Sequence, residues 1–216
     1  HTILVIENHY LGSVLEGNQF DTFYHEHPRT YSYTSFIHIA KALGVELLDA
    51  EFPSRYGGNI RVFLGNTTIN SNENTMNRGE LIDRESHFFD DFGILQKNIE
   101  TWTKSKKHFL DKLIQKHGKL RAKAFPGRAA ILIKLLCLNE DKISAVYEKP
   151  GSLKIGHFLP GTQIPICSDD DLFSKENKNI PLLNLAWHIP AEIKSYLSEN
   201  KYTGKVIDIL SVDDFS

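Results

Sequence analysis

The chain has 216 residues, of which 41% are hydrophobic and 24% are charged, and its formal net charge is -2. These values are typical of a soluble globular protein with one large domain or two modest ones. So small a charge gives no electrostatic reason to expect binding to nucleic acid or to an anionic membrane surface. No apolar run reaches the length of a transmembrane helix, so no membrane partner is expected.

The two cysteines and the start of the chain bear on compartment and completeness. Cys137 and Cys167 have no second cysteine near either of them, which excludes a disulfide framework and a zinc ribbon and favours a reducing cytoplasm. The chain begins with His1 in place of Met and continues directly into a strand-like segment, with no signal peptide. We therefore expect a fragment that starts inside a domain.

Residues 2–7 (TILVIE) form a continuous apolar run that ends in a carboxylate. Such runs are typical of buried parallel strands, so we expect an inner strand of an α/β sheet whose other strands lie upstream. A run of proton-handling side chains follows at residues 24–27 (YHEH), among aromatic neighbours. Imidazole titrates near neutrality, so this run is the leading candidate for a catalytic edge.

A helix with apolar positions at spacings of three and four is expected next, capped by Thr34 or Ser35 and ended by Gly44. Strands are expected at residues 45–52 and 59–64. The Gly57-Gly58 pair between them permits either a close approach of the backbone to a ligand or an ordinary hairpin turn.

The polar segment 66–77 is expected to be a loop at a domain boundary. A long helix is expected over residues 80–117, because Phe88, Phe92, Leu95, Ile99 and Trp102 share one helix face. Beyond Gly118 the pattern alternates. The expected strands are 120–125, 142–148, 181–187 and 205–210, and the expected helices are 127–138 and 191–199. Strands alternating with helices predict parallel βαβ units, and hence a small Rossmann-like domain.

Several segments resemble one family in the right order. The segment FDTFYHEHPRTYSYTSF resembles the YHEH region of bacterial S-adenosylmethionine-dependent sugar C-methyltransferases, which act on nucleotide-linked 4-keto-deoxysugars. The segments GVELLDAEFPSRYGGNIRVFL, KIGHFLPGTQIPI and LLNLAWHIPAEI are similar to later landmarks of that family. Together these segments span most of the chain.

The resemblance implies an architecture of which this chain holds only the end. Members have an N-terminal zinc-binding domain, a central methyltransferase domain and a Rossmann-like C-terminal domain. We therefore expect an α/β chain made of the tail of a class I methyltransferase sheet (1–70), a linker with a long helix (71–118) and a Rossmann-like domain (119–216). S-adenosylmethionine would be bound mostly by the upstream part, and zinc only by the N-terminal domain, with none in this chain.

The chain also departs from the family. The C-terminal domain of the family usually opens with a glycine-rich turn and a lysine, whereas residues 124–130 here read AFPGRAA, with Arg128 in place of the lysine. Glu148 stands where the family has an aspartate, and the C-terminal tail also differs. These departures argue against a phosphate-cradling turn, although Gly127 at a helix N-terminus could still meet an anion.

The resemblance implies roles for individual residues. His27 would be the base that removes a proton next to the sugar ketone, Tyr24 a hydrogen-bond donor to a sugar oxygen, and Glu26 a group that orients the imidazole or binds a sugar hydroxyl. Further candidates follow the same reasoning. Those for the nucleotide sugar are Gly57, Gly58, Asn59, Arg128 and Lys154, and the candidate for the cofactor side is Tyr10.

Three alternatives stay open. Without the resemblance, a satisfied structural histidine would be the preferred interpretation of His27. A metal site at His25 and His27 is disfavoured, because alternate residues of an extended segment point to opposite faces. The chain could also be a non-catalytic module that binds a nucleotide or a nucleotide sugar. Neither the sugar, the nucleotide nor the oligomeric state can be read from the sequence.

Overall fold

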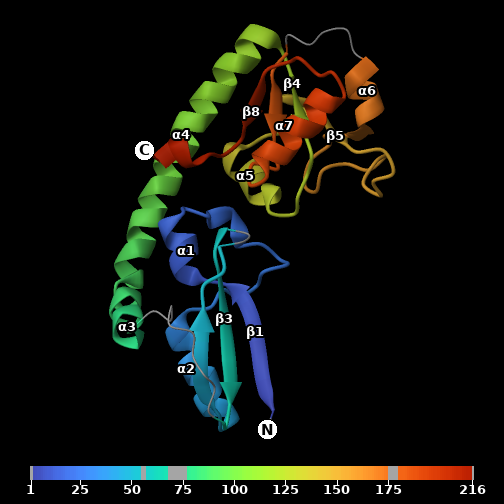
Figure 1. The fold of residues 1–216 in the computed structure, drawn as a ribbon. Coiled ribbons are helices and arrows are strands. Elements are labelled where there is room, and N and C mark those ends of the chain that lie inside the picture. Colours follow the sequence, from blue (N-terminus) through green and yellow to red (C-terminus); the bar gives the residue numbers. More distant parts are fainter. Residues whose placement is uncertain (1, 55–56, 68–76, 175–179, 216) are drawn as a thin grey trace. The chain divides into compact units, whose positions relative to one another are not determined.

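A computed structural model describes residues 2–54, 57–67, 77–174 and 180–215 (Figure 1). The chain divides into two compact units, residues 1–99 and 100–216. The dividing point falls inside one continuous helix of 30 residues, α4 (Phe88–His117). Most of the expected polar loop at 66–77 lies outside the described residues.

The first unit contains a three-stranded sheet made of β1 (Ile3–His9), β2 (Glu46–Glu51) and β3 (Asn59–Gly65). The order is β1-β3-β2, and β3 runs antiparallel to both neighbours (Figure 1). The central strand is the buried one, since Ile60, Val62 and Leu64 are at most 1% exposed.

The expectation of a buried parallel strand at residues 2–7 is wrong for the described chain. β1 pairs antiparallel with β3 and forms the edge of this sheet. Ile3, Leu4 and Val5 are 39%, 47% and 52% exposed. The first half of the apolar run is therefore exposed, whereas Ile6 and Glu7 are half-buried.

Three further elements lie between β1 and β2 in the chain: helices α1 (Leu11–Glu16) and α2 (Tyr33–Leu43), and a 3-10 turn at Phe20–Thr22. The cap of α2 is Ser32, just before the predicted Thr34 or Ser35, and its hydroxyl accepts from the Ser35 amide at 3.0 Å. Gly44 ends α2 in the left-handed conformation, as predicted.

The predicted long helix at 80–117 is two helices, α3 (Arg78–Ser86) and α4, separated at His87. Glu85 of α3 is almost fully buried, and its carboxylate accepts hydrogen bonds from the Tyr33 amide at 2.6 Å, the Thr34 amide at 2.8 Å and the Thr34 hydroxyl at 2.7 Å. A carboxylate at a helix N-terminus satisfies unpaired amides and the helix dipole together. Glu85 thus joins α3 to the start of α2.

The second unit contains a five-stranded parallel sheet in the order β6-β5-β4-β7-β8. Its strands are β4 (Leu120–Lys123), β5 (Ile143–Glu148), β6 (Ile166–Ser168), β7 (Leu182–Asn184) and β8 (Val206–Asp208). Its shorter helices are α5 (Ala129–Leu136), α6 (Asp169–Ser174) and α7 (Pro190–Glu199). The predicted parallel α/β domain is confirmed.

Three elements of the second unit were not predicted. β6 directly follows a proline-containing loop and has only three residues, which is too short to show the alternation of apolar and polar side chains that indicates a strand. α6 begins at the next residue after β6. The end of the chain forms a 3-10 turn, Val212–Phe215, whose Asp214 accepts from the Trp102 indole at 3.2 Å and pairs with Lys106 at 2.8 Å.

No helix among the described residues is both long and apolar enough to cross a bilayer.

Replacing Glu85 with glutamine should loosen α2. The variant keeps the shape of the side chain but loses the negative charge of the carboxylate that accepts hydrogen bonds from the Tyr33 and Thr34 amides. The loss should reduce the stability of the start of α2 by about 2 kcal/mol. Hydrogen exchange at the amides of α2, followed by mass spectrometry, should become roughly 30-fold faster. The matched control is Asp83→Asn, which removes an exposed carboxylate from the same helix. Equal protection in both variants would contradict this role.

Candidate functional site

The Tyr24–His27 run forms a turn, because the His27 amide donates to the Tyr24 carbonyl at 2.9 Å. It follows the buried 3-10 turn, where Asp21 and Thr22 are at most 1% exposed and the Thr22 hydroxyl donates to the Gln19 carbonyl at 2.7 Å. A buried turn therefore anchors a more exposed one. The segment is not extended, so the expected alternation of its side chains between two faces does not apply.

The turn brings three of the predicted residues together. The Tyr24 hydroxyl donates to Glu26 Oε2 at 3.0 Å. The Tyr24 ring meets the His27 ring edge-on, with centroids 5.3 Å apart and planes at 74°. His25, by contrast, has a side chain that is 82% exposed and lies 3.9 Å from Glu26. The carboxylate of Glu26 thus contacts the phenol, and Tyr24 contacts the imidazole of His27.

Tyr24 and His27 line a pocket of about 330 Å³. Phe23 and Leu11 contribute apolar walls, and Phe92 of α4 lines the same pocket. Arg29 is the pocket's cation, and no described residue forms a hydrogen bond or ion pair with its guanidinium. An acid-base group, a phenol, apolar walls and a cation in one hollow suit a small polar ligand that carries negative charge.

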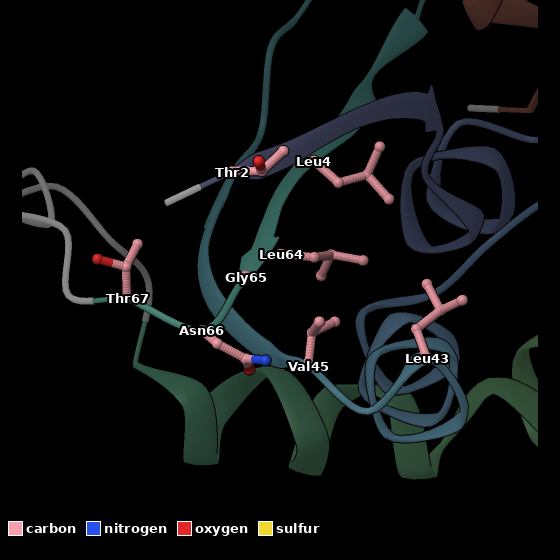
Figure 2. A pocket seen from close by; sticks show the side chains of 8 residues that line it. All are labelled: Thr2, Leu4, Leu43, Val45, Leu64, Gly65, Asn66 and Thr67. Atoms are coloured by element: carbon pink, nitrogen blue, oxygen red, sulfur yellow. The ribbon is translucent and has the colours of Figure 1, made fainter.

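A second pocket of the first unit contains none of the predicted site residues. It measures about 360 Å³ and is lined mainly by aliphatic side chains at one end of the sheet, where Leu4, Leu43, Val45 and Leu64 converge (Figure 2). None of the described residues that line it has a titratable side chain.

The sequence analysis missed His9, at the end of β1. The His9 ring stacks on the His27 ring with centroids 4.8 Å apart and planes 20° apart. The position of His9 at the end of an apolar strand was the available signal, because strand ends are where side chains often meet ligands. Its partner in space could not be read from the spacing.

Gly57, Gly58 and Asn59 fit closely against the start of the chain. Gly57 and Gly58 have φ values of 91° and 113°, and a Cβ atom at either position would clash, at Gly57 with Gln19 and at Gly58 with Ser13. The Asn59 side-chain amide donates to Glu7 Oε1 at 2.9 Å. This packing explains the glycines physically, and a direct contact of these residues with substrate stays a prediction.

Tyr10 lies in the core rather than in a pocket. Its side chain is 1% exposed, and its ring meets Phe52 edge-on at 4.9 Å while the Arg84 guanidinium lies 5.6 Å from the ring centroid. Burial raises the pKa of the Tyr10 hydroxyl well above its usual range, and the carboxylate of Glu85 adds to that shift. The predicted contact with the cofactor has no open surface here.

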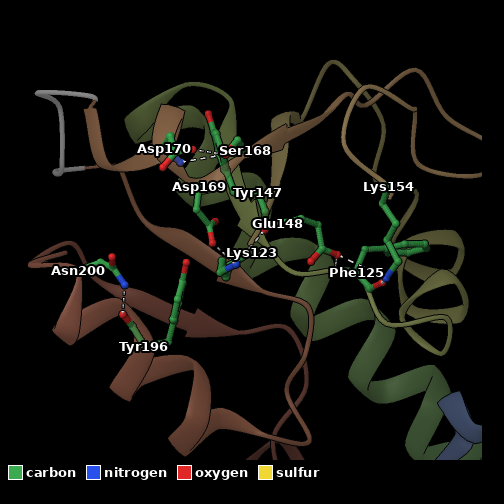
Figure 3. A network of polar contacts seen from close by, with 10 residues as sticks. All are labelled: Lys123, Phe125, Tyr147, Glu148, Lys154, Ser168, Asp169, Asp170, Tyr196 and Asn200. Atoms are coloured by element: carbon green, nitrogen blue, oxygen red, sulfur yellow. Dashed lines mark hydrogen bonds and ion pairs between the residues drawn. The ribbon is translucent and has the colours of Figure 1, made fainter. Parts of the chain in front are cut away.

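In the second unit, Lys154 closes the turn between β4 and α5 (Figure 3). Its ammonium donates to the Phe125 carbonyl at 2.5 Å and lies 3.5 Å from Glu148, and Glu148 accepts from the Phe125 amide at 2.9 Å. Ala124 in the same turn has a φ of 59°. The Arg128 guanidinium lies over the Trp187 ring at 5.2 Å. Both predicted phosphate ligands therefore have protein partners, and their binding role stays a prediction.

The sequence analysis also missed a buried ion pair. Lys123 at the end of β4 and Asp169 at the start of α6 are 1% and 0% exposed in their side chains and lie 2.9 Å apart (Figure 3). The Lys123 ammonium also donates to the Tyr147 carbonyl at 3.2 Å. Burial, together with Asp169, raises the pKa of Tyr196 to about 12. The pair links the carboxyl end of the sheet to α6.

Removing one partner of this pair should cost more than removing both. Lys123→Met leaves Asp169 charged and buried, which should destabilise the second unit by about 3–5 kcal/mol. Lys123→Met combined with Asp169→Leu should recover most of that loss. Urea unfolding followed by tryptophan fluorescence reports on this unit, because Trp102 and Trp187 both belong to it. Additive losses in the double variant would contradict the coupling.

A comparison with protein families identifies the chain. The family of C-methyltransferase C-terminal domains matches residues 54–209, which run from just before β3 to just after β8. The matched residues do not include the Tyr24–His27 turn. A search of the curated proteins finds no match. Among the residues that the structure describes, no cluster of histidine, cysteine or acidic side chains could hold a metal ion. The chain belongs to the C-methyltransferase C-terminal domain family.

Proposed function

We propose that this chain is the C-terminal part of an S-adenosylmethionine-dependent enzyme that methylates a carbon of a nucleotide-linked 4-keto-deoxysugar. The observation that carries the proposal is the pocket that gathers His27, Tyr24 and Arg29 in one unit. The matched family supports C-methylation, and carbon methylation next to a ketone needs a base and a donor to the enolate oxygen. His27 and Tyr24 supply groups of those two kinds.

The proton step can be written from this chain's residues. His27 accepts the proton from the carbon next to the ketone, and the electrons of the broken C–H bond form the enolate, whose charge falls on the former ketone oxygen. The Tyr24 hydroxyl, which donates to Glu26 in this structure, then donates its hydrogen bond to the enolate oxygen and stabilises its charge. Glu26 is then available to a sugar hydroxyl. His27 later releases its proton to solvent.

S-adenosylmethionine, when bound, offers an electrophilic methyl group on a sulfonium. Tyr10, the predicted contact with this cofactor, is buried in the core and offers it no open surface. We propose that the cofactor is bound mostly by a part of the protein upstream of residue 1. The exposed apolar side chains of β1 support this placement, since a strand of that composition is ordinarily covered by neighbouring elements. The free Cys137 and Cys167 fit a reducing cytoplasm.

Arg29, which has no hydrogen-bond or ion-pair partner among the described residues, supports a phosphorylated substrate. Every other described arginine of the first unit has a protein partner: Arg61 bridges Glu7 and Glu51, Arg84 pairs with Glu16, and Arg78 donates to backbone carbonyls. Arg29 is left for a ligand. In a nucleotide sugar the diphosphate lies only a ring's width from the acidic carbon, so one pocket can serve both groups.

A non-catalytic module that binds a nucleotide sugar is the alternative. It is favoured by one observation, that the family match lies outside the Tyr24–His27 turn. The two functions differ in one measurable step, the removal of the sugar proton, which a binding module would not accelerate.

His27→Ala in the full-length protein should stop proton removal. The assay is deuterium exchange at the carbon next to the ketone of a thymidine-diphosphate 4-keto-6-deoxyhexose in D₂O, followed by NMR, which needs no methyl donor. We expect at least a hundredfold loss of exchange, with binding of S-adenosylmethionine unchanged by calorimetry. His25→Ala, at the exposed neighbouring imidazole, should stay active. Equal exchange in wild type and His27→Ala would remove His27 from the role of base.

Arg29→Gln should weaken binding of the same probe without slowing its reaction. A charge-assisted hydrogen bond to phosphate contributes about 1.5–3 kcal/mol, so KM should rise roughly tenfold or more while the maximal exchange rate changes little. Arg29→Lys should restore part of the affinity. The control is Lys41→Gln, an exposed cation on α2 outside the pocket. An unchanged KM would exclude Arg29 from phosphate binding.

A further inference from the structure

We propose that His9 is a positioning residue for His27, and that the face of its ring stabilises the imidazolium that forms when His27 takes the substrate proton. This inference rests on the proposed function, because it assigns a partner to the proposed base. His9 does not line the pocket itself, so it acts through His27.

The backbone of His9 is held on two sides. As the last residue of β1 it faces Asn59 in the ladder with β3. On the other side, the Tyr31 amide donates to the His9 carbonyl at 3.5 Å, and the next residue, Tyr10, forms a parallel bridge with Tyr31. The ring of His9 therefore projects from a strand end whose position is determined by the sheet.

The ring of His27, in contrast, projects from a short turn in which His25 and Glu26 are exposed. Two neighbouring rings contact it. Tyr24 approaches edge-on at 5.3 Å, and His9 lies flat against it at 4.8 Å with planes 20° apart. Tyr24 belongs to the same turn as His27, so the contact between their rings does not determine the position of the turn relative to the sheet. Among the ring contacts of the described residues, the stack on His9 is the one that joins the imidazole of His27 to the sheet.

The stack also favours the charge that develops during the reaction. When His27 accepts the proton, a cationic ring lies over the π face of His9, and an aromatic face attracts a cation. The attraction is weaker before the proton moves, because His27 is then neutral. An interaction that strengthens along the reaction raises kcat more than it lowers KM.

Two substitutions of similar size separate this role from simple packing. His9→Phe keeps a flat π face without a titratable group, and His9→Leu fills comparable space without a π face. In the deuterium-exchange assay on the full-length protein, with the same thymidine-diphosphate 4-keto-6-deoxyhexose, we expect the maximal rate of His9→Phe to stay within about threefold of wild type. That of His9→Leu should fall by about five- to thirtyfold, with KM within about twofold.

The outcomes distinguish this inference from the proposed function. Exchange in wild type that His27→Ala abolishes establishes the base independently of His9. Equal rates in His9→Phe and His9→Leu, with that base established, would overturn the inference, because packing alone would then account for His9. A loss that appears as a raised KM with an unchanged maximal rate would overturn it as well. Absence of exchange in wild type would instead reject the proposed function.

Discussion

The pairing of β3 with β1 is the constraint on which the first unit depends. β3 is the buried central strand, and its first residue, Asn59, lies opposite His9. Gly57 and Gly58 precede β3 and pack against residues that follow β1, and the Tyr10 amide donates to the Gly58 carbonyl at 3.2 Å. One ladder thus determines where β1 ends, and with it the position of the ring against which His27 stacks.

The second unit depends on a different kind of interaction. In its parallel sheet, β4 pairs with β5 on one side and with β7 on the other. At the end of β4, Lys123 forms an ion pair with Asp169, and both side chains are buried from water. Burying such a pair carries a large desolvation cost, so the pair is better understood as a device that specifies geometry than as a net source of stability. It sets where α6 begins relative to the end of β4, which a short β6 alone would define weakly.

The sequence predicted features whose cause is local and missed features whose cause is a distant partner. Gly44 and Gly118 both adopt the left-handed conformation that ends a helix, and alternating strands and helices correctly predicted the parallel sheet. The direction of β1 depends on its pairing with β3, which an apolar run does not encode. The grouping of Tyr24, Glu26 and His27 was predictable from their adjacency, whereas the stack of His9 on His27 joins residues that only the fold brings together.

The turn after β4 has an energetic consequence of its own. Ala124 occupies a φ of 59°, a conformation that glycine adopts freely and that costs a residue with a Cβ atom about 1–2 kcal/mol. The bonds of Lys154 and Glu148 to Phe125 hold the backbone immediately beyond it. The turn is thus kept in a glycine-like shape by side-chain bonds rather than by an intrinsic backbone preference, so loosening those bonds would let the loop relax toward a different path.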